Sequence, residues 1–306
     1  MGAAVSQRPK VSVIIACYNR AHIVPRAIRS AFAQDYRPLE VIVADDGSSD
    51  DSVEVAALHG AKVIAHEHIG PPGIRNVGVA GSSGDYIAFL DADDVWTEGS
   101  LSQRMALFGK ADVGLVFADA GVESGRGETY LTGRAEIDEM ETAPLGEGEH
   151  LILSDAVPYL LRRSFVLTST AIIKREVWDE VVGFDPDLLF AEDFDLWLRI
   201  GERYRFAYTD SVAALYEQRD DSMTRKRKFV AYGLVKVWTK QYHRFWSRYP
   251  KLRPLLSSRL GSCAYEAGLI AAQEGDRRQA RRYFGTAIHC QPHFKSAWVS
   301  YAKSLF

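Results

Sequence analysis

The stretch VSVIIACYNR, residues 11–20, joins a continuous apolar, β-branched run to a polar loop. Such runs are typical of strands buried on both faces of a parallel sheet. Three further apolar runs share this character: Leu39–Ala44, Lys62–Ala65 and Tyr86–Leu90. Segments with a helical pattern lie between these runs. Strands that alternate with helices predict βαβ units in an α/β fold with a mostly parallel sheet and flanking helices. Ligands bind beyond the carboxyl ends of such strands, so functional residues are expected after Ala16, Ala44 and Leu90.

The helices between these strands have recognisable starts. Asn19 can cap a first helix whose apolar positions run from Ile23 to Phe32. Asp50 or Ser52 starts a second, and a third covers about residues 72–82. Beyond residue 112 we expect further strands and helices: strands at Val113–Ala118, Thr168–Ile173, Phe206–Tyr208 and Ala213–Tyr216, and helices at Leu151–Arg163, Arg175–Val182 and Phe194–Ile200. Residues 120–150 lack periodicity, which predicts a functional loop or a small hairpin region.

The last quarter of the chain, from residue 225, has a helical pattern. Residues 260–290 combine small residues at close-packing positions, a Gly-Asp turn and an aromatic pair. This pattern resembles one tetratricopeptide unit, and a plain helical hairpin fits equally well. Because one such unit cannot bury its own face, we expect the helices to pack on the rest of the chain or to serve a protein partner or self-association.

The composition limits the class of protein. Of 306 residues, 47% are hydrophobic and 25% charged, as in soluble globular proteins, and this length predicts roughly two domains. Lys and Arg total 37 against 40 Asp and Glu, which excludes a strongly basic nucleic-acid-binding protein. The three cysteines form no C-x-x-C pair, so a reducing compartment fits best. Residues 1–10 contain no apolar segment and no apolar run reaches about 18 residues, so we expect neither a signal peptide nor a membrane span.

Three carboxylates, Asp91, Asp93 and Asp94, follow the predicted strand Tyr86–Leu90 within four residues. A hard divalent cation such as Mg²⁺ or Mn²⁺ would relieve their mutual repulsion and use their oxygens. The alternative is an acidic turn that caps the next helix, and the short D-x-D pattern alone would favour it. The position beyond a buried parallel strand favours the metal site.

Other polar residues follow the first two strands. Asp46 can accept a hydrogen bond from a nucleobase or a ribose hydroxyl, or belong to a plain glycine turn. Tyr18 can stack on a base, Arg20 can reach a phosphate, and Asn19 can cap the helix. Arg75, near a helix start, is either a diphosphate ligand or a surface arginine. No G-x-G-x-x-G or G-x-x-x-x-G-K-[ST] motif occurs, so the dinucleotide-binding fingerprint is absent and the protein is not a P-loop protein.

A second acidic group precedes a hydrophobic helix in AEDFDLWLR, residues 191–199. Leu196, Trp197 and Ile200 anchor that helix, so the acids at its start are held rigidly. Favourable interaction with the helix dipole explains these acids without a function. The functional alternative is a fixed general base.

Taken together, five segments resemble the inverting family-two glycosyltransferases of GT-A fold: VSVIIACYNR, EVIVADDGSSDDS, GIRNVGVAGSSGDYIAFLDADD, VGFD and AEDFDLWLR, in this order within residues 10–224. The resemblance implies single-displacement transfer from a nucleotide-diphosphate sugar to an acceptor hydroxyl, with inversion. It implies that Ala16, Tyr18 and Asp46 line the base and ribose site. It also implies that Asp91 and Asp93 serve ribose and metal-bound diphosphate, with Asp93 the direct ligand, and that Asp193 is the base, with Glu192 beside it on the acceptor side.

The chain departs from the family pattern in places. Family members often carry a Tyr-Arg-x-His segment whose His can contact the metal ion or the diphosphate. Here Arg219 stands in place of that His and can instead pair with phosphate. Ile74 replaces the usual alanine before Arg75-Asn76, and no Gln-x-x-Arg-Trp segment occurs. We therefore expect transfer of a single sugar rather than processive synthesis. A nucleotidyltransferase and a catalytically inactive, sugar-nucleotide-binding homologue are the rival interpretations.

The resemblance also sets expectations for the whole chain. Residues 1–224 would form the GT-A domain, with a nucleotide-sugar half at about 10–118 and an acceptor half at about 119–224, and residues 225–306 a helical extension. The expected donor is a UDP-sugar, with dTDP and GDP as alternatives, and the expected acceptor is a glycan or a lipid-linked glycan. The setting would be cytoplasmic cell-surface glycan assembly. The basic run at 225–228 allows at most peripheral membrane contact, and a solvated helix face explains it better.

Overall fold

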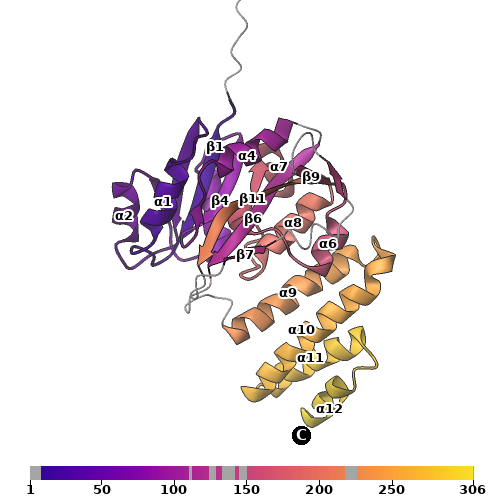
Figure 1. Ribbon diagram of the computed structural model, residues 1–306. Helices are drawn as coiled ribbons and strands as arrows, with labels where there is room; N and C mark the ends of the chain where they lie inside the picture. The colour runs from indigo at the N-terminus through magenta and orange to yellow at the C-terminus, as the bar shows by residue number, and fades with distance from the viewer. Residues whose placement is uncertain are drawn as a thin grey trace, which may run out of the picture. The chain divides into compact units, whose positions relative to one another are not determined.

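The computed structural model describes residues 8–109, 112–123, 129–132, 142–144, 150–217 and 226–305. In these residues eleven strands form one mixed sheet, and its main path runs β3-β2-β1-β4-β10-β6-β11-β9-β8. Figure 1 shows the sheet with helices beside it and the later helices α9 to α12 in succession. The predicted α/β fold with a C-terminal helical region is confirmed.

The amino-terminal half of the sheet is parallel, as predicted. Its strands are β1 (Val11–Cys17), β2 (Leu39–Asp45), β3 (Lys62–Ala65) and β4 (Tyr86–Asp91). Ala16 of β1 pairs with Ala44 of β2 on one side and with Asp91 of β4 on the other. The loops after these three strands therefore begin at one edge of the sheet. This edge is the place where a parallel sheet positions its ligands.

Helices α1 (Val24–Phe32), α2 (Ser52–Leu58) and α3 (Pro71–Ala80) connect these strands, close to the predicted ranges. Gly78 of α3 lets that helix approach the sheet, because a Cβ there would lie 2.6 Å from Cγ2 of Ile14. The predicted cap of α1 is wrong. Asn19 lies outside the helix with φ +52°, and Ile23 occupies the cap position without a side-chain hydrogen bond.

The rest of the sheet is mixed. It contains β5 (Val95–Trp96), β6 (Val113–Glu123), β7 (Thr129–Thr132), β8 (Thr142–Pro144), β9 (His150–Leu153), β10 (Ile172–Lys174) and β11 (Arg205–Glu217). Its helices are α4 (Ser100–Met105), η1 (Ala106–Gly109), α6 (Val157–Arg162), η2 (Thr168–Thr170), α7 (Arg175–Val181) and α8 (Glu192–Gly201). β10 runs antiparallel to both β4 and β6, whereas β11 runs parallel to β6.

Three expectations in this half are wrong. The predicted helix 151–163 begins as strand β9, and the helix starts only at Val157, where Pro158 suits a first turn. The predicted strand 168–173 begins as the 3₁₀ turn η2, since Thr170 Oγ1 donates to the Leu167 carbonyl and competes with sheet pairing. The two short strands after residue 205 are one strand, β11, interrupted by register shifts.

The chain divides into two compact units. One holds the described residues up to Pro186 and from Leu196 to the end of β11, and the other holds Asp187–Asp195 and the helices after residue 226. The large side chains fully buried in the sheet unit are mostly aromatic: Phe89, Phe117, Phe184, Trp197, Phe206 and Tyr208. The predicted base Asp193 and its acceptor-side neighbour Glu192 thus group with the helical unit.

The helical unit contains α9 (Arg227–Phe245), η4 (Pro250–Leu252), α10 (Arg253–Gln273), α11 (Arg277–Cys290) and α12 (Lys295–Lys303). Asp276 caps α11 by accepting a 2.9 Å hydrogen bond from the Gln279 N–H. Gly268 lets α10 approach α11, because a Cβ there would lie 2.6 Å from the Phe284 ring. The predicted helix-turn-helix is confirmed, and its tetratricopeptide assignment stays a prediction.

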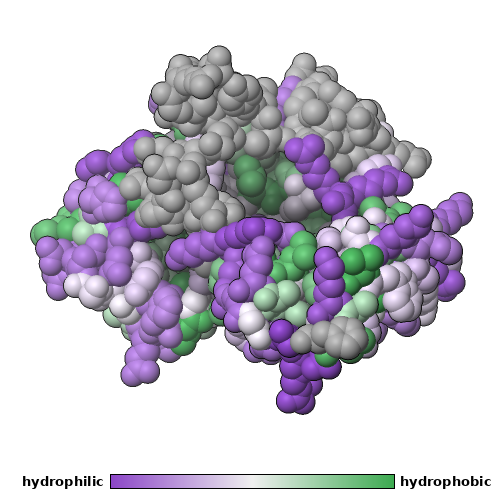
Figure 2. All heavy atoms as spheres, turned by 90° about the horizontal axis from the view of Figure 1, so that it is seen from below, coloured by the Kyte–Doolittle hydropathy of each residue, from purple (hydrophilic) through white to green (hydrophobic). Residues whose placement is uncertain are grey.

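Surface character and hydropathy agree with the composition. Among the coloured residues of the face drawn in Figure 2, hydrophilic side chains predominate, with apolar areas between them. Across the described ranges, none of the helices combines the length and apolar content of a membrane span. Cys17, Cys263 and Cys290 are free thiols.

Candidate active site

The loops after β1 and β2 interlock at the carboxyl edge of the sheet. The Asn19 N–H donates to Ser48 Oγ at 2.8 Å, and the Ser49 N–H donates to Asn19 Oδ1 at 2.8 Å. Asp45 in turn accepts from the Ser48 N–H at 2.9 Å. Asn19 therefore fixes the second loop against the first, a role that its helix-cap pattern did not indicate.

Asp46 is only 3% exposed and receives several donors. The N–H groups of Ile69 and Gly70 donate to its carboxylate at 2.7 and 3.0 Å, and His68 Nδ1 lies 2.9 Å from Oδ2. The ring of His68 is in turn 4.6 Å from that of half-exposed Tyr18. Tyr18 and Asp46 thus lie in one cluster, with His68 between them. His68 was missed by the sequence analysis, because no pattern links it to Asp46.

The acidic turn after β4 is held by a serine distant in sequence. Asp91 is the last residue of β4, and its N–H donates to Ser169 Oγ at 3.0 Å. Ser169 Oγ donates to Asp94 Oδ2 at 2.5 Å. Burial raises the pKa of Asp94 well above its ordinary value, and the charges of Asp91 and Asp93 add to this effect. Asp94 thus anchors the turn that presents Asp91 and Asp93.

Arg75 is 8% exposed, so the surface-arginine alternative is wrong. Its guanidinium donates to Asp91 at 2.7 Å, and its Cζ lies 5.5 Å from the centre of the Phe184 ring. The next residue, Asn76, exchanges two hydrogen bonds with the backbone of Phe184, at 2.9 and 3.0 Å. The middle of α3 is therefore tied both to the acidic turn and to the predicted VGFD segment.

The acidic turn has the chemistry of an open divalent-cation site. Asp94 Oδ1 is buried without a hydrogen-bond partner, and two more carboxylates stand within the same turn. Among the described residues, no three His, Cys, Asp or Glu side chains converge as a complete metal site would require. The carboxylates of this turn could therefore supply only part of the ligands of a Mg²⁺-type or Mn²⁺-type ion, whose other ligands would come from a diphosphate and water.

Glu192 and Asp193 begin α8, two residues earlier than predicted. Ala191, directly before them, has φ +54°, a left-handed conformation that costs a non-glycine residue about 1–2 kcal/mol. Both side chains are partly buried, and Asp193 Oδ1 accepts a 2.7 Å hydrogen bond from the Phe194 N–H. Each acid is thus in the first turn of a helix that follows a strained residue.

Ala16 and Arg20 lie at the end of β1 and in the loop after it, as predicted, whereas other predicted features fall outside the described residues. Ala16 is half-buried near the end of β1, between Ala44 and Asp91. Arg20 lies in the loop after β1, and its N–H donates to Ser52 Oγ at 2.9 Å. Arg219 and most of residues 120–150 lie outside the described residues.

The chain matches the model of glycosyl transferase family 2 over residues 12–165. It belongs to this family. The match spans β1 to β9 of the sheet unit and contains Tyr18, Asp46, Arg75, Asp91 and Asp93. The resemblance stated from the sequence is therefore confirmed as to family, while the role of each residue stays a prediction.

Curated relatives match part of the chain. A glycosyltransferase described as uncharacterized, from Nostoc sp. (strain PCC 7120), is 34% identical over 187 residues, 58% of this chain and 54% of its own length. The amylovoran biosynthesis glycosyltransferase AmsB of Erwinia amylovora is 28% identical over 206 residues, 61% of this chain and 62% of its own length. The matched region thus spans little more than half the length of these relatives.

Two solved structures share the fold. The S. aureus TarS 1–349 complex with UDP-GlcNAc has a TM-score of 0.58 at 18% identity, covering 96% of this chain and 92% of that one. Mannosyltransferase PcManGT from Pyrobaculum calidifontis, in complex with GDP-Man and Mn²⁺, has a TM-score of 0.59 at 19% identity, covering 98% and 86%. These likenesses confirm the GT-A fold.

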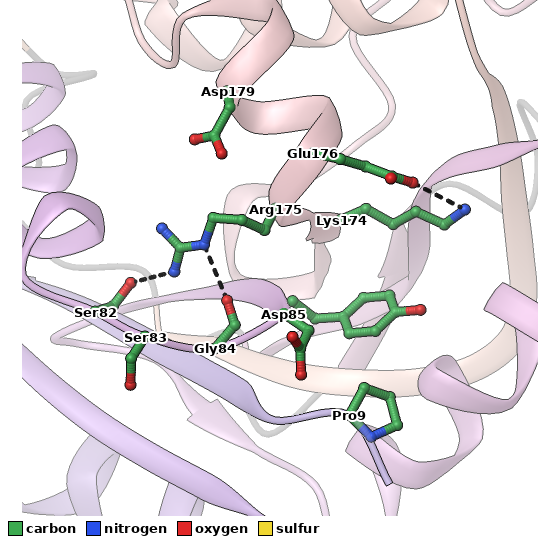
Figure 3. Close-up of a pocket in the computed structure, with 10 residues that line it drawn as sticks. Pro9, Ser82, Ser83, Gly84, Asp85, Lys174, Arg175, Glu176 and Asp179 are labelled. Atoms are coloured by element: carbon green, nitrogen blue, oxygen red, sulfur yellow. Dashed lines mark hydrogen bonds and ion pairs between the residues drawn. The ribbon is translucent and has the colours of Figure 1, made fainter. Parts of the chain in front are cut away.

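An open pocket of about 670 Å³ lies at the other edge of the family-two sheet, where β4 begins. Figure 3 shows Arg175 directed toward Gly84 and Ser82, and Glu176 toward Lys174. Arg175 Nε donates to the Gly84 carbonyl at 2.9 Å and Nη2 to Ser82 Oγ at 2.6 Å. These bonds hold α7 to the turn before β4, so we assign this pocket to the packing of the sheet.

Proposed function

We propose that the protein is an inverting glycosyltransferase that moves one sugar from a UDP-sugar to an acceptor hydroxyl. The observation that carries this proposal is the gathering of Asp46, Arg75 and Asp91 at one edge of a family-two sheet, with Asp91 and Asp93 in one acidic turn. A buried arginine beside carboxylates suits a ligand that carries both ribose hydroxyls and phosphates.

The donor would bind across the ends of β1, β2 and β4. Tyr18 and Asp46 would contact the base, Ala16 and Asp91 the ribose, and Asn19 and Arg20 would complete the first loop, while Arg219 would pair with phosphate. Asp93, with Asp91, would hold the divalent cation. Such an ion supplies charge neutralisation to the leaving diphosphate. Support for a nucleotide-sugar donor and a divalent cation comes from the nucleotide-sugar and Mn²⁺ complexes of proteins with the same fold.

Asp193 would be the general base, and Glu192 would lie on the acceptor side. The acceptor oxygen bonds to the anomeric carbon while the bond from that carbon to the diphosphate oxygen breaks. The acceptor proton passes to the Asp193 carboxylate, and the bonding electron pair leaves on the nucleoside diphosphate. The developing charge on that leaving group is stabilised by the Arg75 guanidinium, a fixed donor. One displacement inverts the configuration of the sugar.

The acceptor would be a glycan or a lipid-linked glycan in polysaccharide assembly, in the cytoplasm or at the inner face of the membrane. The name of AmsB, an amylovoran biosynthesis glycosyltransferase, supports this setting. The C-terminal helices would serve a protein partner or self-association. Trp298, Val299 and Leu305, in or after α12, are exposed apolar side chains that would suit such contact.

Nucleotide release from a panel of UDP-, dTDP- and GDP-sugars, with and without Mn²⁺, tests the proposal. We expect release of UDP that depends on the metal and is stimulated by an acceptor glycan. Release of pyrophosphate from a nucleoside triphosphate and a sugar phosphate would instead identify a nucleotidyltransferase. Tight binding of sugar nucleotide without turnover on any acceptor would identify an inactive homologue.

A further inference from the structure

The turn that carries Glu192 and Asp193 packs on helix α9 through an aromatic ring on each side. Phe190, before the acids, meets Phe229 edge-on with ring centres 5.9 Å apart. Phe194, after them, lies 5.4 Å from the ring of Trp238. Both contacts lie inside the helical unit, so α9 holds both ends of the segment that carries Glu192 and Asp193.

Asp195 adds a polar anchor to the same helix. Its side chain is fully buried, and its carboxylate accepts from Gln241 Nε2 at 2.7 Å and from Lys240 Nζ at 2.9 Å. Gln241 is also fully buried. A buried carboxylate with its donors is weak evidence for stability, because the cost of removing the charges from water offsets the attraction. We therefore attribute the buried Asp195 contacts to a requirement that this segment keep one fixed position.

The backbone between these anchors is strained. Ala191 is left-handed at φ +54°, and such residues persist only where the surroundings fix them. Gly233 of α9 lets Phe190 approach that helix closely, because a Cβ at Gly233 would lie 2.5 Å from the Phe190 Cβ. The strained residue, the acids and the anchors thus form one continuous segment, 190–195, against one helix.

Helical periodicity relates the side-chain direction of Asp195 to that of Asp193. Residues two apart on an α-helix differ in direction by about 200°. Asp195 is directed at α9, so Asp193 projects from the opposite side of α8. Fixing Asp195 therefore fixes the side of α8 from which Asp193 projects.

We propose that Asp195, Gln241 and Lys240 are positioning residues that aim the Asp193 carboxylate at the acceptor, so that α9 belongs to the catalytic machinery. This inference rests on the proposed function, in which Asp193 is the base. A general base acts only within hydrogen-bond reach of the proton it removes. A misplacement of about 1 Å can cost about 100-fold in rate.

The test compares Gln241→Met and Lys240→Met with wild type in the full chain. Turnover is divided by the number of UDP-binding sites found by calorimetry, which corrects for unfolded protein. We expect kcat to fall about 10- to 100-fold while donor KM and UDP affinity stay unchanged. Lys240→Arg keeps a cationic donor and should retain most of kcat. Lys228→Met is the matched control, because it removes another α9 lysine whose ion pair is with Glu274 of α10, 2.8 Å away.

A double variant separates positioning from stability. If Gln241 acts through Asp193, adding Gln241→Met to Asp193→Asn should cause no further loss of kcat. A full additional loss, or a normal kcat in both single α9 variants while Asp193→Asn is impaired, overturns the positioning role and leaves the proposed function intact. A normal kcat in Asp193→Asn itself overturns the assignment of the base, and this inference with it. If Gln241→Met does not fold, Lys240→Met, at a partly exposed side chain, decides the question.

Discussion

The guanidinium of Arg75 donates a 2.7 Å hydrogen bond to the carboxylate of Asp91. Arg75 is the fifth residue of α3 and Asp91 the last residue of β4, and Arg75 is almost fully buried. The arginine therefore holds Asp91 in place before any ligand binds. A guanidinium is a planar fork of donors, a geometry that matches both carboxylate and phosphate groups.

Arg75→Met should lower kcat/KM for the donor by about 10²–10³, the loss typical of a removed charge-stabilising donor. Arg75→Lys keeps the charge without the planar fork and should recover only part of the rate. Steady-state kinetics with UDP-sugar checks both. The control is Arg203→Met, which removes an exposed pair with Glu180. Equal kinetics for Arg75→Met and Arg203→Met would show that Arg75 has no part in donor binding.

Asp93→Ala should abolish turnover and leave the melting temperature unchanged within a few degrees. We expect this because Asp93 would be the direct protein ligand of a divalent cation, and its side chain is only partly buried. Activity assays with and without Mn²⁺ provide the measurement. Asp179→Ala removes an exposed acid at the other edge of the sheet and should be neutral. Full activity in excess chelator would refute the metal requirement.

Asp193→Asn preserves shape but removes the proton acceptor, so turnover should fall by about 10²–10⁴ or more. Donor binding should be nearly unchanged, because the proposed donor contacts come from other residues. Glu192→Gln, one residue earlier in the same helical turn, is the matched comparison. If only Glu192→Gln loses activity, the two roles are reversed, and if neither does, the acceptor proton leaves by another route.

Asp46→Asn should weaken UDP binding about tenfold, the effect of losing roughly one charged hydrogen bond. The substitution replaces one carboxylate oxygen by a donor that faces the N–H groups of Ile69 or Gly70. The His68 loop should therefore shift away from Tyr18. Calorimetry with UDP, dTDP and GDP measures the affinity. Tighter binding of GDP than of UDP by wild type would contradict the uracil assignment.

Glu40, at the other edge of the sheet, should make the free energy of unfolding depend on pH. Burial alone would raise its pKa, but hydrogen bonds from Ser12, Ser83 and Lys10 outweigh it and lower the pKa to about 2. Because the folded pKa lies below the unfolded value of about 4.3, the stabilisation is present above that pH and is lost as pH falls toward 2. Glu40→Gln should cost about 1 kcal/mol at pH 7, after allowance for solvent screening.

Urea unfolding of wild type and Glu40→Gln at several pH values checks this prediction. The difference in unfolding free energy should stay constant from pH 7 to about pH 5 and shrink below it. A difference that grows on acidification would have the wrong sign and would refute the network as the cause.

The sequence could predict the parallel half of the sheet because its signals are local. A continuous β-branched run such as Val11–Ala16 has few ways to bury its side chains other than as an inner strand. Once the strands are parallel, their carboxyl ends must meet at one edge, so Tyr18, Asp46 and Asp91 were expected together. The family followed from the same segments. The errors fell where local preference was ambiguous, as at residues 151–163, where a short apolar run suits strand or helix.

Only the tertiary structure decided which partner each functional side chain takes. The contacts of Asp46 with Ile69, of Arg75 with Asp91 and of Asp195 with Gln241 cross 23, 16 and 46 residues. Asn19 likewise holds the second loop instead of capping a helix. Hydrogen bonds between distant residues leave no periodic trace in a sequence, because their geometry exists only after the elements have packed. The sequence therefore predicts the residue types at the site, whereas their arrangement depends on how the elements pack.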